Sequence, residues 1–421
     1  MTAVMRGVRV LEVAEHTFVP AASAILSDWG AEVIKVEPAE RGDAMRGLAK
    51  TGVVNLDDGK VHALFEHSNR GKESIGIDLA TEGGREVLYR LVARSDVFLT
   101  NKVPKVCKAL QIEPEDVRAH NPAIIYARGT GYGPLGPDAN LGGYDILGYW
   151  TRSGVAAGAR PPDLDHFISE PGPAYGDSIG AMTIAGGISA ALFHRERTGE
   201  ALTVDVSLLS TGMWALSAIP ALSAHIPVLS AGIALAQQVG KPWTQDPIEL
   251  TELYNPLTRA YRTNDDRWIY LSCLQAFHYW PDACKVVGRE DLIADPRFDT
   301  HENLTSNAME AYRILTEVFR SRPLAEWRER FVGFRGQWSV MQDAKDVVED
   351  PQVKANGYMV EAETVDGVPY PLVATPVQFN SEPAPTARGP EFNEHGDRIL
   401  TEVLGYDWDR VLDLKVKGAI A

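Results

Sequence analysis

Residues 7–37 read GVRVLEVAEHTFVPAASAILSDWGAEVIKVE. Two apolar runs rich in β-branched residues, 7–14 and 31–37, flank a helical pattern from Pro20 to Trp29, and Gly30 ends that helix. A strand, a helix and a second strand in this order form a βαβ unit, which places two strands side by side and parallel in one sheet. The stretch therefore predicts an α/β fold.

The alternation of strands and helices continues to about residue 222. Such alternation is typical of a doubly wound, mostly parallel sheet of the Rossmann-like kind, with helices on both faces. We expect further strands at 74–79, 96–100, 123–127 and 202–206, and helices at 81–94, 104–110, 114–120, 178–195 and 207–222.

The pattern changes after residue 223. Residues 224–262 have no clear period, and a strand at 267–272 followed by helical segments at 276–287 and 309–333 predicts a smaller α+β domain. The later chain is rich in proline, ends in helical patterns at 395–404 and 408–415, and has too few apolar residues for a core of its own. We predict a large domain from 1–223, a small domain with its linkers from 224–350, and a C-terminal segment, 351–421, that returns to the large domain.

The overall charge is strongly acidic. The chain has 41 Lys and Arg residues against 57 Asp and Glu, a formal net charge of -16, which argues against nucleic acid or an anionic membrane as partner. Three cysteines without CxxC spacing indicate reduced thiols, and no metal-ligand pattern occurs, so we expect no metal site. No leader-like segment and no run approaching membrane-spanning length stand out, so we expect a cytoplasmic protein.

The first βαβ unit raises the possibility of a dinucleotide site. Glu37 ends the second strand, where such folds place an acid on a ribose, but residues 14–20 lack the glycines of the G-x-G-x-x-G turn. We therefore expect an adenine nucleotide in a different pose, with three or four basic side chains near the strand ends converging on its phosphates. The candidates are Lys35, Arg46, Arg70, Lys72, Lys102, Lys105 and Lys108.

Residues 173–182, PAYGDSIGAM, hold the candidate nucleophile. Asp177 stands at the start of the apolar helix expected from 178 to 195, where free N–H groups and the helix dipole favour an ionised carboxylate. Gly176 and Gly180 leave room for the reacting carbon of a ligand. An ordinary helix cap is the competing interpretation of Asp177.

Several blocks, in their order and spacing, resemble the family III CoA-transferases, which include formyl-CoA:oxalate and carnitine CoA-transferases and α-methylacyl-CoA racemase. The resemblance is carried by GVRVLEV at 7–13, GAEVIKVEP at 30–38, Gly42-Asp43 with Arg46, NRGK at 69–72, Asn101, GDS at 176–178 and RTG at 197–199, and more weakly by later blocks up to 352. It implies a coenzyme A thioester as substrate rather than a permanently bound cofactor, a carboxylic acid as second substrate, and a homodimer of two interlocked chains.

The resemblance also implies roles for individual residues. Asp177 matches the catalytic aspartate, Gly180 lies beside it at the helix start where N–H groups would stabilise oxyanions, and Tyr144 and Asp145 match a pair near the bound acyl group. Pro38 and Val19 depart from the family pattern, which has arginine and glycine there. The positions expected to bind CoA are His16, Thr17, Lys72, Ile77, Asn101, Lys102 and Lys108.

The expected function is transfer of CoA between an acyl-CoA and a carboxylic acid through covalent intermediates on Asp177. An α-methylacyl-CoA racemase is an alternative, but Tyr144 stands where the racemases have a histidine, and a phenol is a poor base at neutral pH. The sequence is also compatible with a non-catalytic CoA-binding protein and, less well, with a nicotinamide oxidoreductase. Purely structural roles remain open for several positions: a helix cap for Thr17, a core side chain for Ile77, a turn for Asn101, and helix-start packing for Tyr144 and Asp145.

Overall fold

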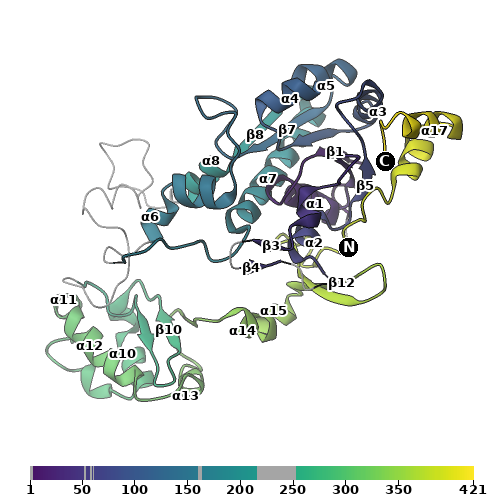
Figure 1. The fold of residues 1–421 in the computed structure, drawn as a ribbon. Helices are drawn as coiled ribbons and strands as arrows, with labels where there is room; N and C mark the ends of the chain where they lie inside the picture. The colour runs from purple at the N-terminus through teal and green to yellow at the C-terminus, as the bar shows by residue number, and fades with distance from the viewer. Residues whose placement is uncertain (1–2, 52–53, 57–58, 60, 160–163, 216–252) are drawn as a thin grey trace. The chain divides into compact units, whose positions relative to one another are not determined.

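The computed structural model describes residues 3–51, 54–56, 59, 61–159, 164–215 and 253–421 (Figure 1). The chain divides into two compact units, one formed by residues 1–244 and 352–421 and the other by residues 245–351. The C-terminal residues thus belong to the same unit as the N-terminal βαβ stretch.

The larger unit is built on a six-stranded sheet. Its strands are β1 (Arg9–Val13), β2 (Glu32–Glu37), β5 (Glu73–Gly76), β6 (Val97–Thr100), β7 (Ile125–Thr130) and β8 (Thr203–Ser207). All neighbours are parallel, and the order β5-β2-β1-β6-β7-β8 corresponds to 3-2-1-4-5-6 along the chain. This is the order of the doubly wound Rossmann fold, so the predicted α/β class is confirmed. The strand order reverses between β1 and β6, which makes the carboxyl ends of these two strands the expected ligand crevice.

Helices cover both faces of this sheet. Successive strand residues point to opposite faces, so Val10 packs with one helical layer and Leu11 with the other. Figure 1 shows the C-terminal helix beside α3 (Glu82–Val92) at the edge of the unit. One layer holds α1 (Phe18–Asp28) and α7 (Tyr175–Thr198), and the other holds α3 (Glu82–Val92), α4 (Pro104–Leu110), α5 (Pro114–His120) and α17 (Trp408–Val416).

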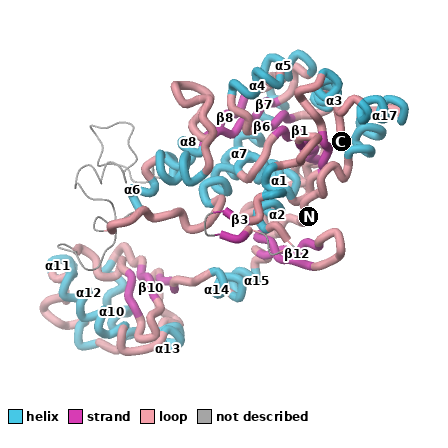
Figure 2. Tube along the Cα trace, in the orientation of Figure 1, coloured by secondary structure: helices cyan, strands magenta, loops and turns pink. Residues whose placement is uncertain are grey.

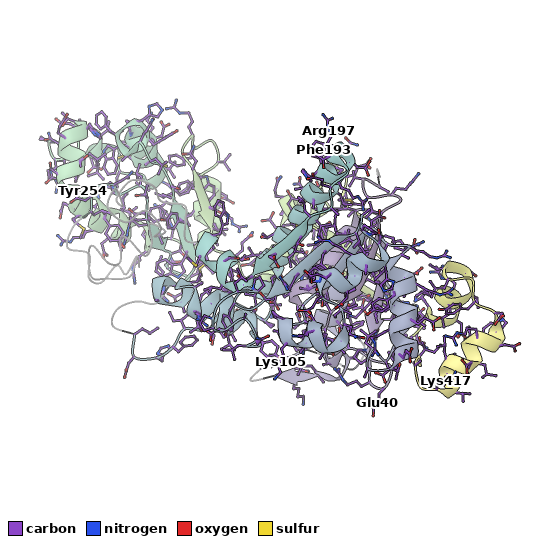
Figure 3. All side chains as sticks on the ribbon, turned by 90° about the horizontal axis from the view of Figure 1, so that it is seen from above. Glu40, Lys105, Phe193, Arg197, Tyr254 and Lys417 are labelled. Carbon is purple, nitrogen blue, oxygen red and sulfur yellow. The ribbon has the colours of Figure 1, made fainter. Side chains whose placement is uncertain are left out.

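Helix α7 is the long helix predicted after the candidate nucleophile. Among the described residues it is the one helix long and apolar enough, by length and composition, to cross a membrane, which corrects the expectation that no such run exists. Its apolar side chains Ala181, Ile184 and Ile188 are buried against α1 and the sheet, while Phe193 and Arg197 in the last turns point outward (Figure 3). This packing is that of a core helix.

Some elements differ from the sequence predictions. Helix α2 (Ala63–Asn69), the π-helical turn η2 (Ile146–Arg152) and the hairpin of β12 (Met359–Glu363) and β13 (Pro369–Val373) were not predicted, because these short segments carry no clear apolar period. Helix α8 (Leu208–Ala215) occupies the first part of the helix predicted at 207–222, and the rest lies outside the described residues. The remaining short elements are η1 (Ala44–Gly47), β3 (Lys50–Thr51), β4 (Val54–Asn55), α6 (Val155–Ala159), α14 (Ala344–Glu349), α15 (Pro351–Ala355), α16 (Gly396–Arg398) and η4 (Ile399–Val403).

The smaller unit packs helices on a three-stranded antiparallel sheet of order β11-β10-β9 (Figure 2). Its core is aromatic and includes the fully buried Trp280 and Trp327. The helical segment predicted at 309–333 is two helices, because Pro323 precedes the second. The elements are β9 (Ala260–Arg262), β10 (Trp268–Leu271), β11 (Trp338–Val340), α10 (Ala276–Val287), η3 (Glu290–Leu292), α11 (His301–Ser306), α12 (Ala308–Phe319) and α13 (Leu324–Arg330).

Candidate active site

A cleft of about 550 Å³ opens at the carboxyl ends of β1, β2 and β6. It lies at the switch point of the sheet, where doubly wound folds bind their ligands. Two of the positions predicted to bind CoA, Ile77 and Lys102, line it, as does Pro38. The end of the chain forms another wall: Ile420 bridges to Ile77, and Asp78 N–H donates to the Ala419 carbonyl at 2.9 Å. The sequence analysis expects residues 351–421 to return to the large domain, but it does not place them at this cleft, because no local pattern shows where they pack.

Glu15 forms ion pairs with two cationic side chains of this cleft. Its Oε1 lies 2.6 Å from Arg41 Nη1, and its Oε2 lies 2.5 Å from Lys102 Nζ. Burial raises the pKa of Glu15, but Arg41 and Lys102 outweigh this effect and hold it below its usual value. The cleft therefore contains two cationic side chains that an anionic ligand would share with Glu15. Sequence analysis assigned a role to Lys102 but not to Glu15 or Arg41.

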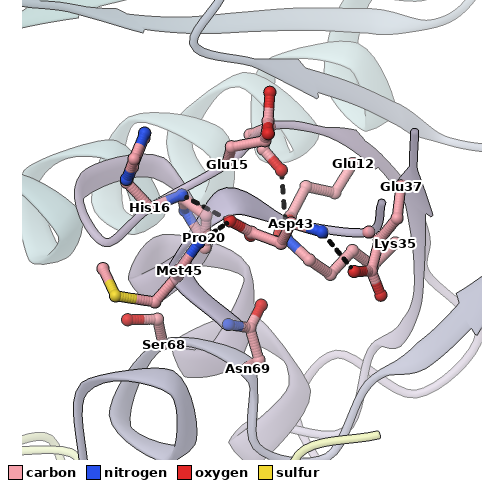
Figure 4. Close-up of polar contacts among 12 residues, drawn as sticks. Glu12, Glu15, His16, Pro20, Lys35, Glu37, Asp43, Met45, Ser68 and Asn69 are labelled. Carbon is pink, nitrogen blue, oxygen red and sulfur yellow. Dashed lines mark hydrogen bonds and ion pairs between the residues drawn. The ribbon is translucent and has the colours of Figure 1, made fainter. Parts of the chain in front are cut away.

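Other basic residues turn inward to buried acids. Lys35 Nζ lies 2.8 Å from Glu12 Oε1 and 2.7 Å from Asp43 Oδ2 (Figure 4). Lys72 Nζ lies 2.7 Å from Glu12 Oε2. The Lys35, Lys72 and Glu12 side chains have no exposed surface. We therefore correct the expectation that Lys35 and Lys72 converge on phosphates: their charges are paired in the core, because a buried ion needs a buried partner.

Two more predicted phosphate contacts are paired in the same way. Arg46 binds Glu37 with both ends of its guanidinium fork, at 2.8 and 2.7 Å, and Arg70 lies 3.0 Å from Asp28. Glu37 also accepts hydrogen bonds from Ser74 Oγ and from a backbone N–H. The hydrogen bonds of the Glu37 carboxylate are thus used within the protein, so it is not available to a ribose. The position of Glu37 therefore no longer indicates a dinucleotide site.

The loop after β1 contains His16 and Thr17. His16 has a positive φ of 67°, and its N–H donates to Asp43 Oδ1 at 3.1 Å. Thr17 is buried and begins α1 without a side-chain cap. Asn101 holds this loop from the neighbouring strand, since its Nδ2 donates to the Glu15 carbonyl at 2.6 Å. Asn101 therefore contacts the chain that lines the cleft rather than the cleft itself.

Lys108 does not reach the cleft. The residues of α4 that line it are Val106 and Leu110, one helical turn apart. Lys108 falls between them in the chain and is exposed on another side of the helix. The structure therefore separates Lys108 from Lys102, although the sequence analysis placed both at one site.

Three carboxyl groups gather at the start of α7. Asp177 is 8% exposed, and its Oδ1 is buried without a hydrogen-bond partner among the described residues. Burial, followed by the nearby Asp145 and Glu170, raises its pKa well above the usual value. Burial and Asp145 also raise the pKa of Glu170 to about 8. Sequence analysis missed Glu170. It expected the helix start to keep Asp177 ionised, whereas burial and the two neighbouring acids disfavour the ionised form.

The first turn of α7 offers free backbone N–H groups. Ala174 is the cap residue, so Asp177 lies inside the helix and is not its cap. Ser178 N–H already donates to the Ala174 carbonyl, which leaves the N–H groups of Tyr175, Gly176 and Asp177 outside the helical ladder. Gly180 lies further along, where N–H groups are committed to the helix. The N–H groups outside the helical ladder are therefore those of the first turn and not that of Gly180.

The glycines of this helix allow close packing. A Cβ on Gly180 would lie 2.4 Å from the Phe18 ring, and one on Gly176 would lie 2.4 Å from the Tyr149 ring. Both positions are thus filled by neighbouring aromatic side chains. This corrects the expectation that they leave room for a ligand.

Two histidines contact sequence neighbours of the acid cluster, which consists of Asp145, Glu170 and Asp177. The His16 and Tyr144 rings meet edge-on with centroids 5.5 Å apart, and Tyr144 directly precedes Asp145. His67 Nε2 lies 3.2 Å from Ser178 Oγ, next to Asp177. Burial, with a smaller contribution from Arg70, lowers the pKa of His67 to about 4, so this ring is neutral. Among the described residues no group of three or more His, Cys, Asp or Glu side chains is arranged to hold a metal ion.

Comparison with known proteins gives a consistent result. The chain is 27% identical over 412 residues to the (R)-2-hydroxy-4-methylpentanoate CoA-transferase of Clostridioides difficile, covering 98% of both chains. It is 30% identical to the succinyl-CoA:glutarate CoA-transferase of Mus musculus, covering 99% of this chain and 90% of that protein. The crystal structure of Rv3272 from M. tuberculosis superimposes with a TM-score of 0.74 at 27% identity, covering 93% of this chain and 98% of that one.

The family model described as CoA-transferase family III matches residues 5–396, nearly the whole chain. The six strands of the sheet, the residues of the cleft other than its C-terminal wall, and the three carboxyl groups near the start of α7 lie within the matched residues. The chain therefore belongs to CoA-transferase family III.

Proposed function

We propose that this protein transfers CoA from an acyl-CoA to a free carboxylic acid through covalent intermediates on Asp177. The observation that carries the proposal is a buried carboxyl group with an unpartnered oxygen, among the described residues, at the open first turn of a helix. Burial penalises the charged carboxylate, which is why the pKa of Asp177 is raised. The same penalty favours acylation, because an anhydride or thioester carries no charge.

The chemistry proceeds in balanced steps. The Asp177 carboxylate attacks the thioester carbonyl, the C–S bond breaks, and CoA leaves as a thiolate from an acyl-aspartyl anhydride. The thiolate attacks the aspartyl carbonyl, which releases the donor acid and leaves an aspartyl-CoA thioester. An acceptor carboxylate displaces the thiolate to form a second anhydride, and the thiolate then attacks the acceptor's carbonyl. New acyl-CoA leaves and Asp177 is restored.

The residues around Asp177 support these steps. The N–H groups of Tyr175 and Gly176, which lie outside the helical ladder, would donate to the charge that develops on each tetrahedral oxygen. Burial and Asp145 raise the pKa of Glu170 to about 8, which limits the negative charge that Glu170 places beside Asp177 near neutral pH. Tyr144 and Asp145 adjoin the site where the acyl group reacts.

We place the nucleotide end of CoA in the cleft. Arg41 and Lys102 would bind its phosphates in competition with Glu15, and Ile77 would contact its adenine. His16, one residue beyond Glu15, leads toward Tyr144 and the acid cluster, so the pantetheine arm would pass this loop. Thr17 and Asn101 would then act by shaping the loop.

The test is to trap the intermediate. Acyl-CoA alone should acylate the wild-type protein, and hydroxylamine should convert Asp177 to a hydroxamate found by mass spectrometry. Asp177→Ala should remove both the label and transfer, whereas Glu196→Gln, at the exposed end of the same helix, should keep both. Transfer at the wild-type rate by Asp177→Ala would refute the mechanism.

A screen of donors and acceptors would identify the substrates. The first acceptors to try are branched 2-hydroxy acids and glutarate, because the names of two relatives include them. Exchange of the α-hydrogen with deuterated water, without transfer, would favour a racemase, and CoA binding without turnover would favour a binding protein.

We further propose a cytoplasmic homodimer of interlocked chains. Light scattering in solution would check the dimer.

A further inference from the structure

The smaller unit contains a second cavity, of about 390 Å³, that the proposed function does not use. It lies where the antiparallel sheet meets α12, and its volume is in the range of sites for small organic ligands. Its lining is mostly apolar, and the residues that matter here are Trp268, Tyr270, Tyr312, Val340, Met341 and Arg259.

Arg259 is the cation of this cavity. The residue is 7% exposed, and its Nε is buried without a hydrogen-bond partner among the described residues. Within the described part of the chain, no carboxylate lies in ion-pair distance of its guanidinium and no acceptor receives a hydrogen bond from it. Its Cζ stands over the Tyr312 ring, 5.5 Å from the ring centroid.

An unpaired cation in this position is unusual for this protein. Buried Arg70, at a similar exposure, pairs with Asp28, and Lys35 and Lys72 pair with Glu12. A buried charge without a partner is costly, and the face of one ring compensates only part of that cost. An anion from outside the described chain would complete the arrangement.

We propose that this cavity binds a small carboxylate with an aromatic or branched apolar tail. A guanidinium carries paired N–H donors in a fork that matches the two oxygens of a carboxylate. Trp268, Tyr270 and Tyr312 supply ring surfaces for the tail, with Val340 and Met341 completing the apolar wall. The site lies wholly within residues 245–351 and does not depend on the chemistry proposed for Asp177.

Calorimetric titration of the full-length protein tests the proposal, with 3-phenylpropanoate as the probe and 3-phenylpropanamide as its uncharged counterpart. The carboxylate should bind at least about tenfold more tightly than the amide, since it alone forms charge-assisted hydrogen bonds. Arg259→Gln should weaken carboxylate binding by about tenfold or more, and Arg259→Lys by less. The matched control is Arg262→Gln at the end of β9, three residues further along the chain, because the Arg262 side chain is 40% exposed and pairs with Asp266.

The titrations are repeated in Asp177→Ala, which separates this cavity from the transfer site. Retained binding there, together with loss in Arg259→Gln, supports the proposal whether or not the protein transfers CoA. Equal affinity of Arg259→Gln and Arg262→Gln overturns it, as does the absence of binding by the folded wild-type protein at millimolar probe. Binding that disappears in Asp177→Ala and persists in Arg259→Gln assigns the probe to the transfer site and also overturns the proposal.

Discussion

The imidazole ring of His16 meets the phenol ring of Tyr144 edge-on, with centroids 5.5 Å apart. His16 follows Glu15, which lines the cleft proposed to bind the nucleotide, and Tyr144 precedes Asp145, which lies near Asp177, the proposed nucleophile. The backbone of His16 is held by Asp43. This ring contact therefore links the two halves of the proposed site.

Removing the Tyr144 ring is expected to lower kcat/KM for the acyl-CoA. An edge-to-face pair contributes about 0.5–1.5 kcal/mol beyond its buried area, so Tyr144→Ala should cost up to about tenfold. Tyr144→Phe keeps the ring and should stay within about twofold of wild type. Steady-state kinetics check this, and unchanged kinetics in Tyr144→Ala would contradict it.

Charge changes in the cleft should alter CoA affinity in opposite directions. Lys102→Gln removes a cation and should raise the Kd for CoA by about three- to tenfold, whereas Glu15→Gln removes the competing anion and should lower it by about threefold. Lys108→Gln, outside the cleft, is the control and should leave the Kd unchanged. Calorimetry at low and high salt measures these effects, and an equal loss in Lys102→Gln and Lys108→Gln would exclude Lys102 from the phosphate site.

Lys72 is expected to act on stability. Lys72→Met leaves Glu12 buried with one cation fewer, which should lower the free energy of unfolding by about 3 kcal/mol. The exposed Lys108→Met should change it by less than about 0.5 kcal/mol. Denaturant titration compares the two variants. Full stability of Lys72→Met with weakened CoA binding would instead return Lys72 to the ligand site.

Gly180 should be required for packing. The new methyl group of Gly180→Ala would press on the Phe18 ring and should destabilise the protein by about 1–3 kcal/mol. Gly186 lies in the same helix with open space around it, so Gly186→Ala should stabilise by about 0.5–1 kcal/mol. Phe18→Leu should recover part of the loss in Gly180→Ala, and thermal unfolding of the three proteins decides the point.

His67 should make stability depend on pH below neutrality. Its pKa falls from 6.5 to about 4 on folding, so the unfolded state binds more protons between these values. The free energy of unfolding therefore decreases as the pH is lowered through this window. His67→Gln removes the effect, and from pH 7 to pH 5 it should lose about 1–2 kcal/mol less than wild type. The exposed His301→Gln should follow the wild-type curve in denaturant titrations at both pH values.

Local patterns determined much of the fold. The βαβ unit in residues 7–37, the helix after Asp177 and the parallel sheet could be predicted, because apolar period and helix-ending residues act over a few neighbours. The position of Asp177 at a helix start was visible in the same way. Helix α2 and the turn η2 could not be predicted, because packing against segments distant in the sequence stabilises them.

The tertiary structure alone decided where the charges lie. Lys72 pairs with Glu12 sixty positions away, whereas Lys102 reaches the cleft, and nothing near either lysine distinguishes them in the sequence. The pKa of Asp177 likewise depends on Asp145 and Glu170, which come from other segments of the chain. Charge interactions act through space and depend on burial, so only the strand order and the helices that cover it determine which charges are paired and which face a ligand.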